Sequence, residues 1–323
     1  MQFFKNCCII KSVKSRIYKG KTRNPYARVR EKRKNGMYHI IVNPVSGKKK
    51  VDKSLETVQR VLTERGAEFI LHRTEKKGDG ERIALELTVC GEEEIIVMGG
   101  DGTLHEVLNG LNDPSKCKLG LIPCGTGNDF AQHVGLPLDS AKAIERILDG
   151  EAKPIDYIDV GGRRSMNVAG LGMDVDVLER CEKGKIRGKI KYLMSLLKSL
   201  FAFKGYEIET ECEGEVRKHG VLIAAVCNGS TFGGGIRICP TAKANDGKMD
   251  VVVVDCIPQK RAIIKAFFEL MKGRILPYPK TTHYLCEQVR FTPAKPCTVQ
   301  LDGELYKELV FDAKICKGLK FYQ

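Results

Sequence analysis

No stretch of this 323-residue chain is long and apolar enough to cross a membrane as a helix, which takes about 20 residues. The longest apolar run, Val221 to Cys227, has the length of a strand. The Walker A and GxGxxG patterns are also missing, because the GKKK at 47–50 has no earlier glycine and no Ser or Thr after its lysine. The 13 cysteines do not form the pattern of a small disulfide scaffold, and adjacent Cys7 and Cys8 lack the spacing of a zinc site. These absences favour a reduced cytoplasmic protein with buried thiols.

Acidic residues are almost absent from residues 1–36, which hold 12 Lys or Arg against the single acid Glu31. This segment supplies +11 of the net charge of +14, and its apolar residues show no periodicity. We therefore predict a disordered basic arm that lies on an anionic membrane, where each cation contributes about 1 kcal/mol. Three other interpretations stay open: nonspecific contact with nucleic acid, organelle targeting, or an upstream start codon with Met37 as the true beginning.

The most informative feature is an apolar strand that runs into a glycine-rich loop. Residues 95–111 read IIVMGGDGTLHEVLNGL, so three glycines, a carboxylate and a hydroxyl lie between a strand end and a helix start. Such a loop lets the backbone approach a polyphosphate and point its N–H groups at it. Asp101 lies where it can hold a divalent cation or a hydroxyl proton.

Two further apolar strands end in polar loops that contain glycine. Residues 38–42 lead into NPVSGK at 43–48, and residues 119–122 lead into PCGTGND at 123–129. Between the first two strands, apolar residues spaced by three and four predict a helix that ends at Gly66. This alternation predicts a parallel sheet whose loops meet at the carboxyl edge of the strands, and hence a nucleotide cleft.

Beyond about residue 155 the pattern changes to short β-type runs separated by turn residues, such as Val221 to Val226, Met249 to Val254 and Val289 to Thr292. This pattern is typical of a sandwich of sheets. Two domains are also the ordinary expectation for a chain of this length.

The motifs, taken in order, resemble those of the diacylglycerol kinase catalytic-domain family, especially its soluble bacterial lipid-kinase branch. GGDGT alone is shared with NAD kinases and phosphofructokinases, but its combination with GTGND and a late DGE is more specific. The resemblance covers roughly residues 37 to 323. The matching residues are Asn43-Pro44, Ser46-Gly47, GGDGT at 99–103, Glu106, Asn109, GTGND at 125–129, Gly233-Gly234-Gly235, Pro240, Ala242, Asp246-Gly247, Asp250 and Asp302-Gly303-Glu304.

The resemblance implies a two-domain fold with the active site in the cleft between the domains. The first would be an α/β nucleotide-binding domain with a parallel sheet, similar to phosphofructokinase and NAD kinase, and the second a mostly β sandwich. We expect the basic arm at 1–36, the ATP-binding domain at 37–155, and a lipid-binding domain at 156–323 that contributes Glu304 to the cleft.

The resemblance also implies roles for individual residues. Phosphoryl transfer to a lipid hydroxyl requires charge neutralisation, alignment and a base. Glu304 would be the base and Asp101 the second catalytic residue, at the nucleotide–metal centre. Asp101 and Asp129 would hold Mg²⁺, and Asp246 a second, structural Mg²⁺; oxygen ligands of this kind suit Mg²⁺ rather than zinc. The nucleotide contacts would be Asn43, Ser46, Gly47, Gly99, Gly100, Gly102, Thr103, Gly125, Thr126 and Asn128.

Simpler interpretations exist for two of these motifs. Asp129 could cap a helix that begins at Asn128, and Asp302-Gly303 could be a hairpin turn.

Three positions depart from the family's common spelling. His105 stands where Asn is frequent, Cys124 occupies a site that is usually small or aliphatic, and Gln132 replaces a frequent Arg. The missing arginine removes a phosphate or lipid contact, so it bears on the substrate more than on the reaction. Because Cys124 lies in a predicted cleft loop, we expect ATP to protect it from thiol reagents.

Residues 183–205 combine apolar residues at helical spacing with interspersed lysines. A basic amphipathic helix of this kind can lie in a lipid interface. The alternative is a helix packed on the β domain.

The resemblance implies a kinase that uses ATP and Mg²⁺ to convert diacylglycerol into phosphatidic acid. The expected partners are this or a related membrane lipid and an anionic membrane surface, with no specific nucleic acid, so the protein would be cytoplasmic and peripherally membrane-associated. A homodimer is possible, although the sequence does not fix the oligomeric state.

Three alternatives to this function remain. The first is a kinase of another lipid alcohol, such as a sphingoid base, phosphatidylglycerol or undecaprenol. An NAD kinase is disfavoured because GTGND replaces that family's second motif. A noncatalytic lipid- or nucleotide-binding protein is disfavoured because Asp101, Asp129, Asp246 and Glu304 are all present.

Overall fold

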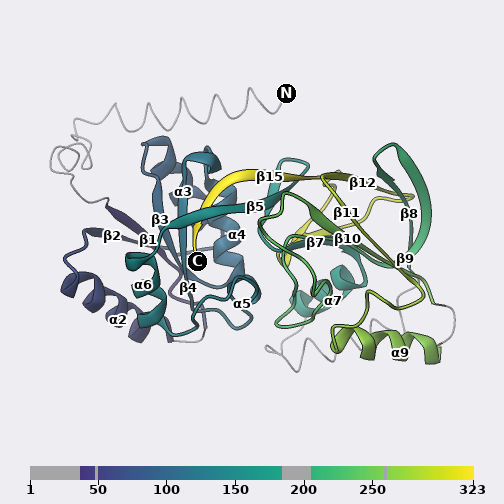
Figure 1. Cartoon of the computed structure of the whole chain (residues 1–323), viewed down its shortest axis with the longest axis horizontal. Coiled ribbons are helices and arrows are strands. Elements are labelled where there is room, and N and C mark those ends of the chain that lie inside the picture. Colours follow the sequence, from purple (N-terminus) through teal and green to yellow (C-terminus); the bar gives the residue numbers. More distant parts are fainter. Residues whose placement is uncertain (1–36, 48–49, 184–204, 258–259) are drawn as a thin grey trace.

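The computed structural model describes residues 37–47, 50–183, 205–257 and 260–323. The predicted basic arm at 1–36, and all but the ends of the predicted amphipathic helix at 183–205, lie outside the described residues. The described chain forms an α/β half and a β-rich half, which lie side by side in Figure 1. The predicted fold class is therefore confirmed.

The α/β half is built on the alternating strands and helices that the sequence predicts. Its strands are parallel and lie in the order β2-β1-β3-β4. The elements are β1 (Tyr38–Val42), α2 (Lys50–Glu64), β2 (Phe69–Arg73), α3 (Asp79–Val89), β3 (Glu94–Gly99), α4 (Asp101–Gly110), the 3₁₀ turn η2 (Pro114–Lys116), β4 (Lys118–Pro123), α5 (Asp129–His133) and α6 (Ser140–Asp149).

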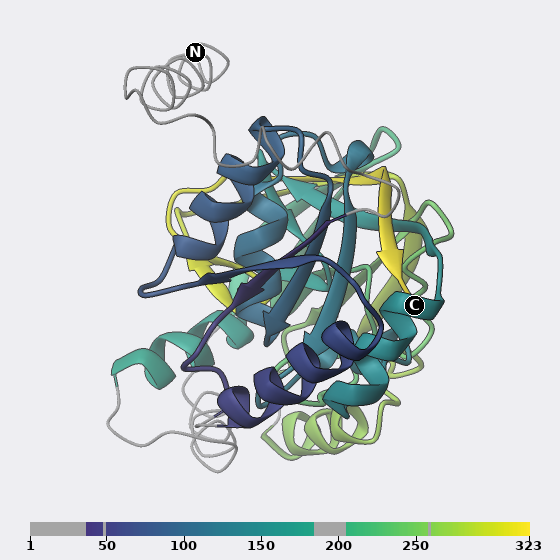
Figure 2. The same cartoon turned by 90° about the vertical axis from the view of Figure 1, so that its left-hand side faces the viewer.

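Helices cover both faces of this parallel sheet, as Figure 2 shows. On one face α2 and α6 pack on the strands, and Leu55 and Ile147 share a buried apolar cluster with Ile40. On the other face α3 and α4 supply buried side chains such as Leu87 and Leu108. Because both faces are covered, the central strands β1, β3 and β4 hold continuous buried apolar runs rather than alternating apolar and polar residues.

The second half consists of antiparallel strands around a separate apolar core. The predicted strands at 221–226, 249–254 and 289–292 lie within β9, β10 and β12. Its elements are β5 (Ala152–Val160), β6 (Arg163–Ser165), β7 (Val168–Gly172), α7 (Met173–Lys183), β8 (Tyr206–Cys212), β9 (Glu215–Cys227), β10 (Met249–Asp255), α9 (Lys260–Met271), β11 (Thr281–Cys286), β12 (Gln288–Pro293), β13 (Val299–Leu301), β14 (Glu304–Tyr306) and β15 (Phe311–Tyr322).

Two long strands, β5 and β15, connect the halves (Figure 1). They pair with each other from Ala313↔Val160 to Tyr322↔Ala152, and the end of β15 pairs in parallel with β4 at Phe321↔Leu119. Hydrogen-bonded strands therefore run without a break from β2 to β14. The expected boundary between residues 155 and 156 falls inside β5, so backbone hydrogen bonds, and not a flexible linker, set how the halves face each other.

Candidate active site

Three loops meet at the carboxyl edge of the parallel strands, and close backbone packing brings them together. A Cβ placed on Gly125 would lie 2.6 Å from the Gly100 Cα, so neither loop has room for a side chain there. Gly47 has a positive φ of 61°, and a Cβ on it would lie 2.0 Å from the Cys124 carbonyl oxygen. Asn43 Nδ2 donates to Thr103 Oγ1 at 3.0 Å, which ties the loop after β1 to the start of α4.

Asn128, one of the predicted nucleotide contacts, also holds its own loop in shape. The Asn128 side chain closes its own loop, accepting from Gly125 N at 2.8 Å and donating to Gly125 O at 3.1 Å. Gln132 Nε2 donates to Gly127 O at 2.8 Å in the same loop. Among the predicted contacts, Gly47, Gly99, Gly125 and Asn128 do not line either of the two cavities described below.

The first cavity, of about 300 Å³, lies over the start of α4. Glu304 reaches it from β14, and its Oε1 is 3.3 Å from a Cβ placed on Gly102. Lys77 Nζ forms an ion pair with Glu304 Oε2 at 2.5 Å and is three-quarters exposed. Lys77 belongs to no motif, so its place beside Glu304 could not be predicted from the sequence. The cavity is lined by Asn43, Val45, Ser46, Thr74, Glu75, Lys76, Lys77, Gly100, Gly102, Thr103, Glu106 and Glu304.

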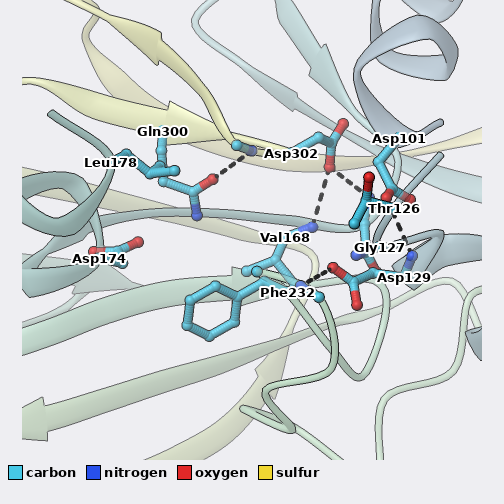
Figure 3. A pocket seen from close by; sticks show the side chains of 14 residues that line it. Asp101, Thr126, Gly127, Asp129, Val168, Asp174, Leu178, Phe232, Gln300 and Asp302 are labelled. Carbon is cyan, nitrogen blue, oxygen red and sulfur yellow. Dashed lines mark hydrogen bonds between the residues drawn. The ribbon is translucent and has the colours of Figure 1, made fainter. Parts of the chain in front are cut away.

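The second cavity, of about 350 Å³, lies between the two halves and is shown in Figure 3. Asp101, Thr126 and Asp129 occupy one side of it, whereas Asp174 and Gln300 come from the opposite side. Its remaining walls include the apolar side chains of Val168, Leu178 and Phe232. The cavity therefore has two polar ends and an apolar middle.

One carboxylate oxygen each of Asp101 and Asp129 lies close to Gly127, at the wall of the second cavity. A Cβ placed on Gly127 would lie 3.2 Å from Asp101 Oδ2 and 3.4 Å from Asp129 Oδ2. Burial, followed by repulsion from Asp129, raises the pKa of Asp101 to about 6. Two converging carboxylates, one of them penalised by burial and by its neighbour, fit a divalent cation such as Mg²⁺, whose charge would relieve the repulsion.

Asp101, and not Asp129, caps α5. Asp101 accepts from the N–H of Asp129 at 3.2 Å and from that of Phe130 at 3.1 Å. The Asp129 carboxylate accepts instead from Gly234 N, in the β-rich half, at 2.7 Å. The interpretation of Asp129 as a simple helix cap is therefore wrong, because this carboxylate bridges the two halves.

Asp302 is a buried hydrogen-bond centre that holds Glu304 in place. With Gly303 it forms a two-residue turn between β13 and β14, both with positive φ (53° and 89°), so the hairpin interpretation is also correct. Its side chain is 3% exposed. It accepts from His105 Nδ1 at 2.9 Å, Ser165 Oγ at 2.7 Å, Met166 N at 2.9 Å, Asn167 N at 2.9 Å and Val168 N at 3.2 Å.

These bonds reverse the effect of burial on Asp302. Burial alone would raise the pKa of this carboxyl, but hydrogen bonding and charge from His105, together with Ser165, lower it below its ordinary value. The His105 Nε2 atom also lies 2.6 Å from the Tyr306 hydroxyl. His105 therefore joins α4 to the turn of the hairpin, at Asp302, and to its strand β14, at Tyr306. The unusual histidine is thus a connection between the halves.

Asp174 and Gln300 were not anticipated from the sequence. Asp174 is buried, and burial raises its pKa to about 6. Hydrogen bonds from the backbone N–H of Val175 and from the Gln300 side chain offset part of this effect of burial. The available signal was an acidic residue just after the apolar strand β7, but Asp174, Asp176 and Glu179 all fit that description.

Asp246 lies apart from the paired carboxylates. It is exposed, lines neither cavity, and accepts from Lys248 N at 3.1 Å. Its charge raises the pKa of nearby Asp156, after the larger effect of burial. Its role in binding a second Mg²⁺ stays a prediction.

Cys124 does not offer an exposed thiol in the cleft. The residue is 8% exposed and packs in the apolar cluster beneath α2 and α6. Burial raises its pKa to about 11. The expectation that thiol reagents label Cys124 in competition with ATP required the thiol to face the cleft. This placement is wrong, because a strand-end position predicts where the backbone lies and not which way the side chain points.

A parallel α/β sheet with glycine-rich loops, joined to a β sandwich that brings a carboxylate hairpin to those loops, defines the NAD-kinase-like fold class. Residues 37–160 match the diacylglycerol kinase catalytic domain, and residues 167–318 match the YegS C-terminal NAD kinase beta sandwich-like domain. The chain belongs to the diacylglycerol kinase catalytic-domain family and is an enzyme of the lipid-kinase type.

Individual relatives cover most of the chain. A diacylglycerol kinase of Bacillus subtilis (strain 168) is 30% identical over 275 residues, which are 82% of this chain and 88% of that protein. A protein of Pseudomonas syringae pv. tomato named "Probable lipid kinase YegS-like" is 28% identical over 261 residues, covering 80% and 84%. The crystal structure of a diacylglycerol kinase from Bacillus anthracis str. Sterne has a TM-score of 0.73 at 25% identity, covering 90% of this chain and 98% of that one.

Among the described residues, no helix is sufficiently long and apolar to span a membrane.

Proposed function

We propose that this chain transfers the γ-phosphoryl group of ATP to the hydroxyl of diacylglycerol, with Mg²⁺ as the metal and phosphatidic acid as the product. One observation carries the proposal. Consecutive residues of one hairpin line different cavities, since Gly303 lines the second cavity and Glu304 lines the first. A base at this junction could take the proton from the lipid hydroxyl in one cavity while the nucleotide occupies the other.

The nucleotide would bind against the start of α4 in the first cavity. The N–H groups at this helix end and the hydroxyls of Ser46 and Thr103 suit phosphate oxygens. When ATP binds, the exposed Lys77 side chain would move from Glu304 to the phosphates. Glu304 would then be free of this ion pair and able to act as the base.

Asp101 and Asp129 would hold Mg²⁺, whose positive charge stabilises the charge that develops on the phosphoryl group. The binding of the cation requires both carboxylates to be ionised. Gly234 and the N-terminus of α5 keep the two carboxylates in this orientation.

The lipid would place its hydroxyl in the second cavity, near the carboxylate pair, with its apolar part along Val168, Leu178 and Phe232. An enzyme working on such a substrate would be cytoplasmic and would associate peripherally with an anionic membrane surface. The basic residues at 1–36 and 183–205 are the proposed attachment segments.

A sphingoid base is the second candidate acceptor, and Asp174 is the observation that favours it. A buried carboxylate at the far end of the cavity could bind the ammonium of a sphingoid base when ionised. When protonated it could donate a hydrogen bond to an ester carbonyl of diacylglycerol.

The test is transfer of phosphate from radiolabelled ATP with Mg²⁺ to mixed micelles of diacylglycerol, sphingosine, phosphatidylglycerol or undecaprenol, with NAD in solution as a further acceptor. Labelled phosphatidic acid supports the proposal, a different labelled lipid changes the acceptor, and labelled NADP moves the enzyme to another class. ATP binding without transfer to any acceptor would favour a noncatalytic protein.

The Glu304→Gln variant tests the base. We expect it to lose at least about 100-fold in turnover with little change in folding, because it keeps the side-chain volume. Glu287→Gln is the matched control, since Glu287 is exposed and lines neither cavity. Normal turnover of Glu304→Gln would exclude it as the base.

A further inference from the structure

Three side chains of metal-binding type converge in the β-rich half, outside both cavities. One ligand atom each from Cys239, Asp250 and His283 lies within 4.8 Å of the other two. His283 Nε2 is 2.7 Å from Asp250 Oδ1. Ligand atoms on one tetrahedral zinc ion, with bonds of about 2.0–2.3 Å, are themselves roughly 3.3–3.8 Å apart. The three side chains therefore need only small movements to share an ion.

Strand register brings a second thiol to the same place. Asp250 on β10 lies directly opposite Cys227 on β9, and residues opposite each other have Cβ atoms about 5 Å apart on the same face of a sheet. His283 on β11 lies opposite Val252, one step along that face from Asp250. The thiols of Cys227 and Cys239 are in hydrogen-bond contact.

Burial makes this cluster unusual for a set of polar groups. Cys227 and Cys239 are 0% exposed and Asp250 is 3% exposed, within an apolar cluster that includes Ile238 and Val252. A carboxylate and thiols in such surroundings are costly to ionise unless a cation is close. The His283 side chain is 28% exposed and gives an ion access from solvent.

The chemistry of Cys239 agrees with this geometry. The hydrogen bond with Cys239, followed by burial, raises the pKa of Cys227. The pKa of Cys239, in contrast, is lowered, first by the hydrogen bond from Cys227 and then, against the effect of burial, by Thr241.

We propose that Cys239, Asp250 and His283 bind one zinc ion, with Cys227 as the fourth ligand. Thiolate, imidazole and carboxylate are the ligands that zinc takes in proteins, whereas Mg²⁺ and Ca²⁺ take oxygen ligands. Four protein ligands form a closed, structural site, and none of the four residues lines either cavity.

The ion would fix the long connection between β9 and β10. Cys239 lies in this connection, as does Gly234, whose N–H binds the catalytic-site carboxylate of Asp129 at 2.7 Å. Zinc would join the connection to the three strands β9, β10 and β11. It would thereby keep the Gly234 N–H within hydrogen-bond distance of Asp129. This role does not depend on which lipid is the acceptor.

The first measurement is the zinc content of the full-length protein, purified without added metal or chelator. We expect one zinc per chain, and loss of it in Cys239→Ser and His283→Asn. His219→Asn is the matched control, because His219 Nδ1 also pairs with an aspartate, Asp255, at 3.1 Å but belongs to no such group of ligands among the described residues. Zinc-free protein, or equal zinc in wild type and both variants, would overturn the proposal.

Cobalt substitution gives an independent readout. Co²⁺ bound to Cys239 should show a thiolate-to-cobalt charge-transfer band in the near ultraviolet, and His283→Asn should weaken Co²⁺ affinity by more than about 10-fold. Since His283 is partly exposed, this variant is expected to stay folded, which circular dichroism checks. Absence of the band, or a disulfide between Cys227 and Cys239 in non-reducing mass spectrometry, would rule out the zinc site.

Discussion

Replacing Asp302 by alanine should destabilise the whole protein, because this residue is the buried acceptor that joins the two halves. The change removes five hydrogen bonds, three of them from consecutive backbone N–H groups. Removing one partner from a buried charged network costs about 3–5 kcal/mol. A simple sum of five bonds would be larger, but water entering the space left by the side chain would satisfy some of the donors.

The assay is urea unfolding of Asp302→Ala beside Asp312→Ala. Asp312 is paired with Arg290 at 2.7 Å on the surface, where such a pair contributes about 1 kcal/mol or less. Since the folded-state pKa of Asp302 is lowered, its contribution is present above the ordinary aspartate pKa and is lost as pH falls through the folded-state value. The difference between wild type and Asp302→Ala should therefore shrink in acid. Equal losses in the two variants at neutral pH would refute the central role of Asp302.

Two further predictions concern the second cavity, and a third concerns the buried thiol of Cys124. Gly127→Ala places a methyl group against the carboxylate oxygens of Asp101 and Asp129. Steady-state kinetics should show turnover reduced roughly 100-fold and a higher Mg²⁺ concentration needed for activity. Unchanged Mg²⁺ dependence would contradict the cation site. Burial raises the pKa of Asp174 to about 6, so its stabilising contribution is full below the ordinary aspartate pKa and is lost as pH rises from there through 6. In urea unfolding, Asp174→Asn should therefore gain about 1.4 kcal/mol on wild type at pH 7.5 relative to pH 5. An equal effect at both pH values would argue against the raised pKa. The buried thiol of Cys124, with its pKa of about 11, should react slowly with alkylating reagents whether or not ATP is present, and rapid labelling that ATP prevents would show that its side chain faces the cleft.

The sequence predicted best those features that follow from the local order of strands, loops and helices. Apolar strands followed by glycine-rich loops predicted the parallel sheet and the meeting of the loops, because a parallel sheet brings all its strand ends to one edge. The nearness of Asp101 and Asp129 also follows from this rule.

The residues that join the halves could not be predicted in the same way. Asp302 has the local signature of a hairpin turn, and its partner His105 lies 197 residues away along the chain. Lys77 and Asp174 stand among other charged residues with the same local pattern, so only the folded arrangement separates them. Long-range partners of this kind leave no periodicity in the sequence.

The position of β15 has a consequence for biosynthesis. Its end pairs with the edge of β4, so this edge of the nucleotide-binding sheet is unpaired while the intervening residues 124–310 are still being made. An unpaired edge is a template for pairing with other chains. The α/β half therefore cannot complete its sheet as an independent N-terminal unit during translation, and the growing chain is exposed to aggregation until β15 arrives.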